Sequence, residues 1–494
     1  MSATRHASVS TAQTSGSRSH DRRAALQDPA PADASRDMAR FAANTRFEDL
    51  SEAAKEITKR SIIDTIGVIN AGTRGQGHDR LVAMVERGRG APESSVIGFG
   101  TRLPAWMAAL ANGAMARAMN FDDGHDRGST HPSSVVVPSV LALAERVGDV
   151  DGRAFLTAVA VGNEVICRLG TALAQRPGGV PHDGWFLSSV LGVFGAAAAC
   201  CRVLGLDEEE TRHAFGIALF EASGTLEAFS PTGQSSMMRG MVTGLTAKSA
   251  VLVASMAQAG ITGVPDSLEG RFGLFPVYFG GSYDRDALTR DLGREWALTG
   301  ISLKAWPTMR YCSAYVDAVG RIVSEHDLVA GDIAEIRVHV AGYVATRFEP
   351  LDEQRRPRNY NHAGHALPYL VAAMAARRRL TIDDLAGGLG DPDVLALAQR
   401  VVPVHDPAFG GDNRLGPAKV VVETRNGALR ERVIEVPYGD PRDPMTLDDL
   451  GAKFRGCMAY RRAPLAASEV DAVLDSLADL EHCADVAALA RRLA

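Results

Sequence analysis

Apolar side chains recur at helical spacing through most of residues 47–260, and this pattern constrains the fold more than any other feature of the chain. The clearest runs are residues 53–69, 153–174, 187–204 and 208–220. Several of these runs are apolar around most of the helix circumference and contain many Ala and Gly residues. Such helices need other helices to bury them, and small side chains let helices approach closely. The sequence therefore predicts a large domain of packed α-helices.

The pattern changes after about Pro265. Residues 333–348 alternate apolar and polar side chains, which predicts a β-strand that ends near Tyr343. Residues 419–436 contain two alternating runs joined around Asn426-Gly427, a dipeptide typical of β-hairpin turns. From Thr446 onward helical periodicity returns. We therefore predict a mainly α protein, with a smaller α+β lid domain inserted before the C-terminal helices of a large all-helical domain.

The predicted domain limits follow these changes. Residues 1–40, rich in Ser, Arg, Ala and Asp, are predicted to be a disordered N-terminal tail. Residues 41–275 and 446–494 are assigned to the all-helical domain, and residues 276–445 to the α+β lid domain. A cleft between two domains is the default place for a small-molecule site.

The composition indicates an ordinary globular protein. Of 494 residues, 46% are hydrophobic and 23% are charged, and the formal net charge is -6. Because no basic stripe appears, nucleic acid is not an expected partner. No secretory signal is apparent, and every long apolar run is interrupted by charged residues or Gly, so we expect no membrane partner. The six cysteines lack CxxC spacing, which favours reduced thiols in the cytoplasm over a zinc or iron-sulfur site.

One polar segment lies between two apolar helical runs, at residues 105–119 and 135–147, and gathers many titratable side chains. It reads NFDDGHDRGSTHPSSVVVP from Asn120 and contains Asp122, Asp123, His125, Asp126 and His131. Histidine and carboxylate groups together can move protons near neutral pH, so the crowding favours acid/base catalysis. Capping of the two helices by the same carboxylates and the following serines is the alternative interpretation.

A second cluster, ISLKAWPTMRY from Ile301, contains two cations around a Trp-Pro turn. Arg310 can hold a carboxylate through two parallel hydrogen bonds, and Lys304 supplies a point charge that can stabilise an enolate or transfer a proton. A solvated turn is the alternative interpretation of this cluster.

Two weaker clusters complete the candidates. Arg239 and Lys248 lie in a Gly- and Ser-rich segment that suggests an anion pocket. His362 and His365 precede an apolar helix, but HxxH alone is a weak metal signal, and capping or packing explains it equally well. Neither the GxxxxGK[ST] spacing nor GxGxxG after a strand is present. We therefore predict no metal, no nucleotide and no other cofactor.

Six motifs occur in order along the chain after about residue 40. They are Asn112-Gly113, FDDG from Phe121, THPSSVVVPSVLALAE from Thr130, AKSAVL from Ala247, ITGVPDSLEGRFG from Ile261 and ISLKAWPTMRY from Ile301. In these motifs the chain resembles the MmgE/PrpD family, which includes 2-methylcitrate dehydratase, cis-aconitate decarboxylase and iminodisuccinate epimerase.

The resemblance implies a cofactor-independent lyase or isomerase, commonly dimeric, with its site between a helical domain and an α+β lid. At the matching positions it implies His131 as the acid/base group and Lys304 as the cationic partner of a substrate carboxylate. Asp122 or Asp123 would orient them, and Tyr343 on the lid strand would be a further proton donor. The residues assigned to substrate binding are Thr130, Arg239, Lys248, Arg310 and His365.

Several positions depart from the family pattern. Phe186 replaces a histidine that often follows Gly-Trp, and Arg239 replaces a lysine that is usual in decarboxylase-like members. Met309 replaces a His or Cys, and Asn120 replaces an acid found in some members. These differences disfavour a cis-aconitate decarboxylase, whereas AGHALPY around His365 is similar to 2-methylcitrate dehydratases.

We therefore predict a hydro-lyase that dehydrates a hydroxylated di- or tricarboxylate by abstracting a C–H proton next to a carboxylate. Within the family, the alternatives are an epimerase or racemase and a decarboxylase of a small polycarboxylate. Outside it, the replaced residues Phe186 and Met309 leave open a non-catalytic metabolite-binding homologue. We also predict a homodimer that acts in the cytoplasm.

Overall fold

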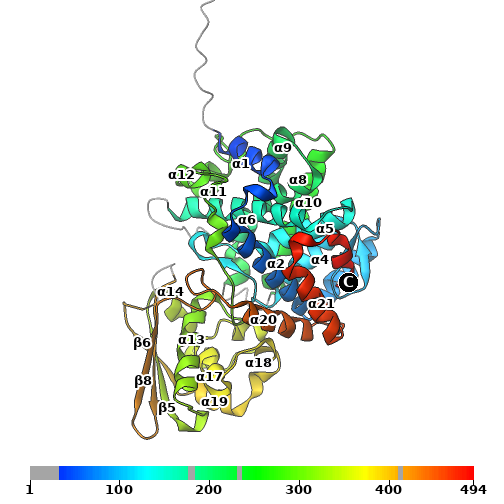
Figure 1. Ribbon diagram of the computed structural model, residues 1–494. Helices are drawn as coiled ribbons and strands as arrows, with labels where there is room; N and C mark the ends of the chain where they lie inside the picture. The colour runs from blue at the N-terminus through cyan, green and yellow to red at the C-terminus, as the bar shows by residue number, and fades with distance from the viewer. Residues whose placement is uncertain (1–32, 176–183, 231–235, 410–414) are drawn as a thin grey trace, which may run out of the picture. The chain divides into compact units, whose positions relative to one another are not determined.

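Long, buried helices dominate the first half of the protein (Figure 1). The structure, a computed structural model, describes residues 33–175, 184–230, 236–409 and 415–494. The inner helices are α4 (Ala105–Ala118), α5 (Ser133–Val147), α6 (Gly152–Ala174), α8 (Gly192–Leu204) and α10 (Val242–Gln258). A Cβ added to Gly162 of α6 would fall 2.9 Å from the carbonyl oxygen of Gly195 on α8. Glycine therefore allows these two backbones to approach closely, as the sequence predicts.

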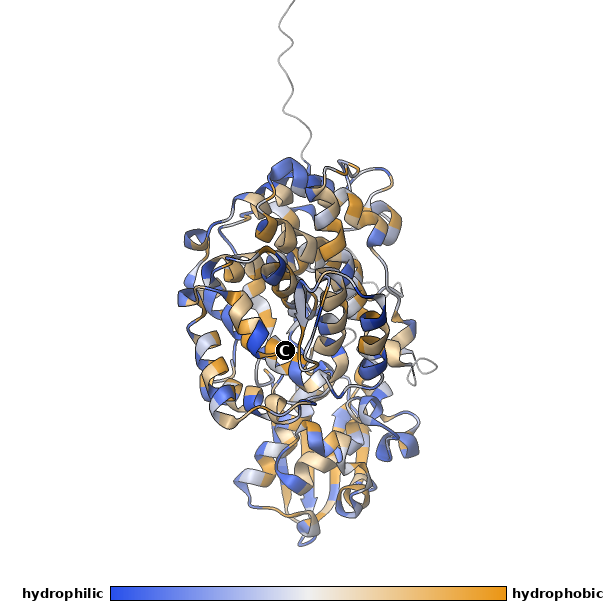
Figure 2. Ribbon diagram, turned by 90° about the vertical axis from the view of Figure 1, so that its right-hand side faces the viewer, coloured by the Kyte–Doolittle hydropathy of each residue, from blue (hydrophilic) through white to orange (hydrophobic). Residues whose placement is uncertain are grey.

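Further helices surround this inner set. They are α1 (Ala34–Asn44), α2 (Glu52–Gly72), α3 (His78–Gly88), α9 (Glu208–Glu221), α20 (Leu447–Ala459), α21 (Ala467–Ala478) and α22 (Val486–Arg492). The C-terminal helices return to the start of the chain, because α20 and α21 contact α2 while α22 contacts α5. Hydrophobic residues are frequent on the inner helices and hydrophilic residues on the outer ones (Figure 2).

The second half contains a four-stranded sheet of order β6-β5-β7-β8. Its strands are β5 (Ile333–Val340), β6 (Val401–His405), β7 (Ala418–Thr424) and β8 (Leu429–Ile434). Strand β5 is parallel to β6 and antiparallel to β7, and the predicted hairpin joins β7 to β8. Helices α13 (Arg310–Glu325) and α17 (Leu367–Arg377) pack beside the sheet (Figure 1). A mainly α fold with a smaller α+β part is thus confirmed.

Two large hydrophobic cores underlie this arrangement, together with a small cluster that includes Val68, Phe121 and Ile382. The first takes its residues from 34–303 and 445–493, and the second takes its residues from 312–434. Phe279, Leu288 and Leu303 belong to the first core. Residues 34–494 nevertheless form one compact unit by their backbone contacts, so the domain limits at residues 275 and 445 stay a prediction.

The structure corrects some predicted boundaries. Helix α1 begins at Ala34, inside the predicted tail of residues 1–40. This part of the chain is ordered because Met38 and Ala39 are fully buried in the first core. Residues 1–32 lie outside the described residues. Strand β5 ends at Val340 rather than near Tyr343. The next segment starts at Gly342, whose φ of 52° turns the chain into the short helix α14 (Gly342–Ala345), so Tyr343 lies on a helix.

Short strands also interrupt the helical half. Strands β1 (Ser94–Val96) and β2 (Thr101–Leu103) form one pair, and β3 (Gly124–His125) and β4 (Ile301–Ser302) form another. The predicted helix over residues 187–204 divides into α7 (Leu187–Val190) and α8. Two segments, 152–174 and 187–204, are long and apolar enough to cross a membrane, but their most apolar windows are 100% and 83% buried within the protein. Such burial is expected of core helices.

Candidate active site

The polar loop between α4 and α5 is fixed by the β3–β4 pair. Gly124 lies opposite Ser302 and His125 lies opposite Ile301. Because Lys304 follows β4 by two residues, this pairing brings it to the loop, and its Nζ donates a hydrogen bond to the carbonyl oxygen of Asn120 at 2.8 Å. The two clusters that the sequence analysis selected separately are therefore one site.

Asp122 lies at the centre of the buried charges. Both of its carboxylate oxygens accept hydrogen bonds from Nη1 of Arg117, at 2.7 and 2.8 Å. Nδ1 of His131 lies 3.3 Å from one oxygen, and Nζ of Lys304 lies 3.7 Å from the other. Burial alone raises the pKa of Asp122, but the charges of Arg117 and its other neighbours outweigh burial and hold the pKa well below its usual range. Asp122 is therefore an anion at neutral pH.

His131 is a neutral imidazole with a defined tautomer. Its Nδ1 lies 2.5 Å from the carbonyl oxygen of Asp123, which can only accept, so Nδ1 carries the proton and Nε2 carries the lone pair. Burial, and then the positive charge of Arg117, lowers the pKa of His131 to about 3. The backbone N–H of His131 donates to Oγ of Ser188 at 2.9 Å, which fixes the residue at the start of α5. His131 is thus arranged to accept a proton.

Lys304 is a buried amine whose proton is easily lost. Only 1% of the residue is exposed, and Nζ also lies 3.3 Å from Oδ1 of Asn120. Asn120 adopts the left-handed conformation, at a φ of 47°, which asparagine tolerates. Burial lowers the pKa of Lys304 to about 8, against the opposing charge of Asp122. At neutral pH Lys304 is a cation that can give up a proton.

Asp123 differs from its neighbour. Its Oδ1 accepts from the backbone N–H of Ser133 at 3.3 Å, so the capping interpretation holds for this side chain. Oδ2 has no hydrogen-bond partner within the described residues. Burial, reinforced by the acids Asp64 and Asp122, raises the pKa of Asp123 to about 8. Asp123 is therefore protonated at neutral pH, and it orients His131 through its backbone carbonyl.

A cavity of about 420 Å³ adjoins these residues. Part of the lining comes from residues 124–126 and 129–131 of the loop, which include Thr130 and His131, together with Arg310. The other lining residues are Trp185, Phe186, Leu187, Leu226, Tyr311, Tyr343 and Leu415. Leu187 belongs to the first hydrophobic core and Tyr311 packs against the second. The cavity thus lies where residues of both cores meet.

Arg310 lines the cavity and has one donor nitrogen without a partner among the described residues. Nε and Nη2 hold the carboxylate of Asp126 at 3.1 and 2.9 Å, and Nη2 lies 3.7 Å from Asp440. Nη1 is buried and has no hydrogen-bond partner within the described residues, and the same is true of Oγ1 of Thr130. Buried polar atoms normally have partners, so these two atoms are suited to a bound carboxylate.

Arg239 and the neutral imidazole of His365 form a neighbouring region whose positive charge comes from Arg239. Arg239 is 8% exposed, lies over the ring of Phe229 and has no ion pair among the described residues. Burial, and then the charge of Arg117, lowers the pKa of Arg239 to about 10. Nδ1 of His365 donates to the carbonyl oxygen of Asn361 at 2.8 Å, and burial, together with Arg239, lowers the pKa of His365 well below its usual range. Neither residue lines the 420 Å³ cavity.

The predicted site residues fall into four groups. His131, Thr130, Arg310 and Tyr343 line the cavity, whereas Asp122, Asp123 and Lys304 form the buried layer joined to His131. Arg239 and His365 lie in the adjoining cationic region. Lys248, half-buried on α10, does not line the cavity, so the structure does not bring it to the other candidates. Their roles stay predictions.

Sequence reasoning missed two cations. Arg117 is the only charged residue of the Ala-rich helix α4, and a buried charge in such a helix could have indicated a functional partner. Lys453 on α20 donates to the carbonyl oxygens of Phe121 and Lys304, both at 2.9 Å, and pairs with Asp64 at 2.6 Å. No local pattern marks Lys453, because its partners come from distant parts of the chain.

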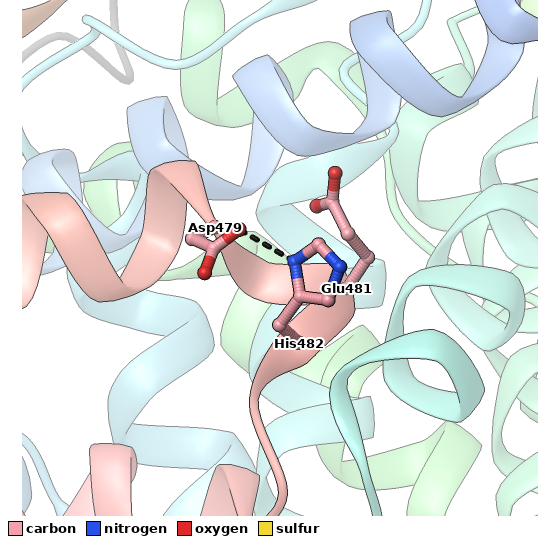
Figure 3. Close-up of side chains that lie close together, drawn as sticks. All are labelled: Asp479, Glu481 and His482. Carbon is pink, nitrogen blue, oxygen red and sulfur yellow. Dashed lines mark hydrogen bonds and ion pairs between the residues drawn. The ribbon is translucent and has the colours of Figure 1, made fainter.

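Among the described residues, one group has the spacing of metal ligands. It consists of Asp479, Glu481 and His482 (Figure 3). Nδ1 of His482 lies 2.6 Å from Asp479, and both oxygens of Glu481 accept from Lys59 at 3.0 Å. Surface ion pairs account for these contacts, and the group does not line the cavity. All six cysteines are free, and five of them are buried.

Comparisons with known proteins agree over most of the chain. The sequence model of the MmgE/PrpD N-terminal domain matches residues 36–286, and that of the MmgE/PrpD C-terminal domain matches residues 306–479. A cis-aconitate decarboxylase-like protein of Aspergillus oryzae is 28% identical over 80% of this chain and 83% of its own length. The cis-aconitate decarboxylases of Aspergillus terreus and Homo sapiens are 25% and 26% identical, over 85% and 88% of this chain and 88% and 89% of their own lengths.

Proposed function

The chain belongs to the MmgE/PrpD family, and from that premise we propose that it is a lyase that transfers a proton at a carbon next to a carboxylate of a small di- or tricarboxylate. The observation that carries this proposal is the state of His131 at the cavity wall. Its Nδ1 is committed to the Asp123 carbonyl, so Nε2 has a free lone pair at neutral pH. A base beside unpartnered donors for a carboxylate is what such chemistry requires.

Substrate binding would strengthen this base. Nη1 of Arg310 and Oγ1 of Thr130 would hold a carboxylate, and the negative charge of the substrate would oppose the cations around His131. Because Arg117 and Lys304 help to depress the pKa of His131, a nearby anion raises that pKa. The imidazole becomes more basic when the substrate is in place.

The finer proposal is dehydration. Nε2 of His131 takes the C–H proton, and the electron pair forms the C=C bond as the C–O bond breaks. Hydroxide leaves as water after it receives a proton, for which Lys304 and Tyr343 are the candidate donors. The charge of Lys304, held by Asp122, stabilises the negative charge that develops next to the carboxylate. The neutral state of His131 favours removal of a proton over donation.

Decarboxylation is the second candidate, and the names of the relatives favour it. In that reaction the C–C bond to a carboxylate breaks, CO₂ leaves, and the carbon skeleton receives a proton. The protonated Lys304 suits that last step. Phe186, where the resemblance leads us to expect a histidine, and Met309, where it leads us to expect a His or Cys, favour a substrate other than cis-aconitate.

Incubation of the full-length protein in D₂O with citrate, 2-methylcitrate, cis-aconitate and tricarballylate distinguishes these reactions. We expect alkene absorbance without CO₂ release from a hydroxylated acid, and deuterium incorporation next to a carboxylate. CO₂ release would instead support decarboxylation. The lyase proposal is wrong if the protein binds polycarboxylates but catalyses neither reaction nor exchange across a broader panel of such acids.

His131→Asn tests the assigned base. Loss of a general base lowers rates by about 10²–10⁴-fold. We expect a decrease of that size in kcat, with the Kd of a non-reactive tricarboxylate changed less than tenfold. His482→Asn, which alters an exposed histidine outside the cavity, is the matched control and should leave both constants unchanged. A variant that loses binding but keeps kcat would contradict the role of His131.

A further inference from the structure

The cavity has two walls of opposite chemistry. The wall with Thr130, His131 and Arg310 carries the base and the donors for a carboxylate. The other lining side chains are almost entirely apolar or aromatic, and this set, called the apolar wall, comprises Trp185, Phe186, Leu187, Leu226, Tyr311, Tyr343 and Leu415. A substrate that is polar over its whole surface would place polar groups against these apolar side chains.

The backbone of the apolar wall also offers few free hydrogen-bonding groups to a ligand. Residues 184–187 and 224–226 run beside each other, and the N–H of Leu226 donates to Gly184 at 2.7 Å. The N–H of Phe186 donates to the carbonyl oxygen of Gly224 at 3.1 Å. These groups are therefore occupied within the protein and leave the side chains as the surface available to a ligand.

Phe186 is a member of the apolar wall that also packs against a cation. Its ring stacks on Phe229 at 4.7 Å between centroids, and the guanidinium of Arg117 lies over the same ring at 5.6 Å. The histidine that the family resemblance leads us to expect at this position would offer a polar group there. In this chain the ring offers hydrocarbon.

Part of the apolar wall also borders a second hollow, whose lining includes the polar residues Thr225, Glu227 and Ser230. This hollow of about 570 Å³ shares Trp185, Leu226 and Tyr343 with the cavity. A ligand chain that starts at the polar wall and passes these three residues would extend from one hollow into the other. A volume of this size suits a ligand larger than a six-carbon acid.

We propose that the substrate is a polycarboxylate that carries an alkyl chain longer than a methyl group, with its carboxylates at Arg310 and Thr130 and its chain along Trp185, Phe186 and Leu226. This proposal rests on the proposed function, because it uses the same cavity and the same carboxylate donors. It goes further in assigning to the apolar wall the recognition of the chain.

A series of 2-alkylsuccinates tests the proposal without turnover. Calorimetry with the full-length protein should show that Kd falls by about fourfold for each methylene that enters an apolar surface. Between 2-methylsuccinate and 2-butylsuccinate, which differ by three methylenes, we expect about a 60-fold fall. Leu226→Asn should remove most of this gain, and it should weaken the binding of 2-butylsuccinate far more than that of 2-methylsuccinate.

The controls separate the two proposals. Leu429→Asn changes an exposed leucine on β8, outside both hollows, and should keep the full gain with chain length. Leu415→Asn, at a second position of the apolar wall, should repeat the effect of Leu226→Asn if either variant folds poorly. Equal affinity across the series, or a gain unaffected by both wall variants, would overturn the alkyl-chain proposal and leave the lyase proposal standing. If no alkylsuccinate or tricarboxylate binds at all, both proposals are wrong.

Discussion

Neighbouring side chains of the same type take different protonation states at this site. Asp122 is held as an anion by Arg117, whereas burial raises the pKa of the adjacent Asp123 to about 8. Sequence alone selected both carboxyls and His131, because polar residues between apolar helices stand out locally. It could not assign their charges, because these depend on Arg117 and Lys304, whose positions relative to the loop are set by folding.

The pH dependence of activity should report Lys304. Burial lowers its pKa to about 8, so the cation predominates below that pH and is lost as the pH rises through it. If the reaction needs the cation, kcat/KM falls about tenfold per pH unit above pH 8. Steady-state rates measured from about pH 6 to pH 10 should show this fall.

Two substitutions complete that test. Lys304→Arg keeps the charge at high pH, so the fall should disappear from the measured range even if the rate is lower. Lys304→Met removes the charge and should give a low rate at every pH. A wild-type profile that stays flat through pH 8 would show that protonated Lys304 is not required.

At the scale of elements, the spacing of apolar residues predicts the long helices, because the side chains that a helix buries recur at about every helical turn. The same reasoning finds the β7–β8 hairpin from Asn426-Gly427. It cannot find β3 and β4, which contain two residues each and depend on a pairing across the chain. It also places the end of β5 too late, because Gly342 turns the chain before the apolar pattern ends.

Helix α20 contributes a positioning residue to the site. Lys453 holds the carbonyl groups of Phe121 and Lys304 and pairs with Asp64. Lys453→Met leaves a buried carboxylate unpaired, so we expect the unfolding free energy to fall by about 3–5 kcal/mol. The charge of Lys453 also helps to lower the pKa of Lys304, so its removal should move the alkaline fall in activity to higher pH.

The pH profile distinguishes positioning from stability alone. Asp64→Asn combined with Lys453→Met removes the unpaired charge and should recover much of the stability in urea unfolding. The profile should still be shifted in this double variant, but by less, because the charge of Asp64, which acts on Lys304 in the opposite direction, is lost together with the larger influence of Lys453. Lys453→Arg should restore the original profile. Recovery of stability together with a wild-type profile in the double variant would show that Lys453 serves the fold only.

At the scale of the whole molecule, the site joins two hydrophobic cores that form one compact unit. The sequence anticipated a mainly helical fold with a smaller α+β part, but the position of the cavity depends on where side chains such as Arg310 and Leu187 meet. The formal net charge of -6 does not oppose an anionic substrate, because Nη1 of Arg310 has no partner in the part of the chain that the structure describes. A homodimer and a cytoplasmic location stay predictions.

A ligand in this cavity should stabilise the folded chain as a whole. Because a non-reactive tricarboxylate such as tricarballylate would bind only where Arg310 and the α4–α5 loop are assembled, it should favour the folded state. At a concentration of 100 times Kd the expected gain in unfolding free energy is about 2.7 kcal/mol. Urea unfolding followed by circular dichroism, with and without the ligand, measures this gain. Arg310→Met should abolish it, whereas Arg430→Met, at an exposed position of β8, should keep it. An equal gain in both variants would mean that the anion binds elsewhere on the protein, and the carboxylate site at Arg310 would be wrong.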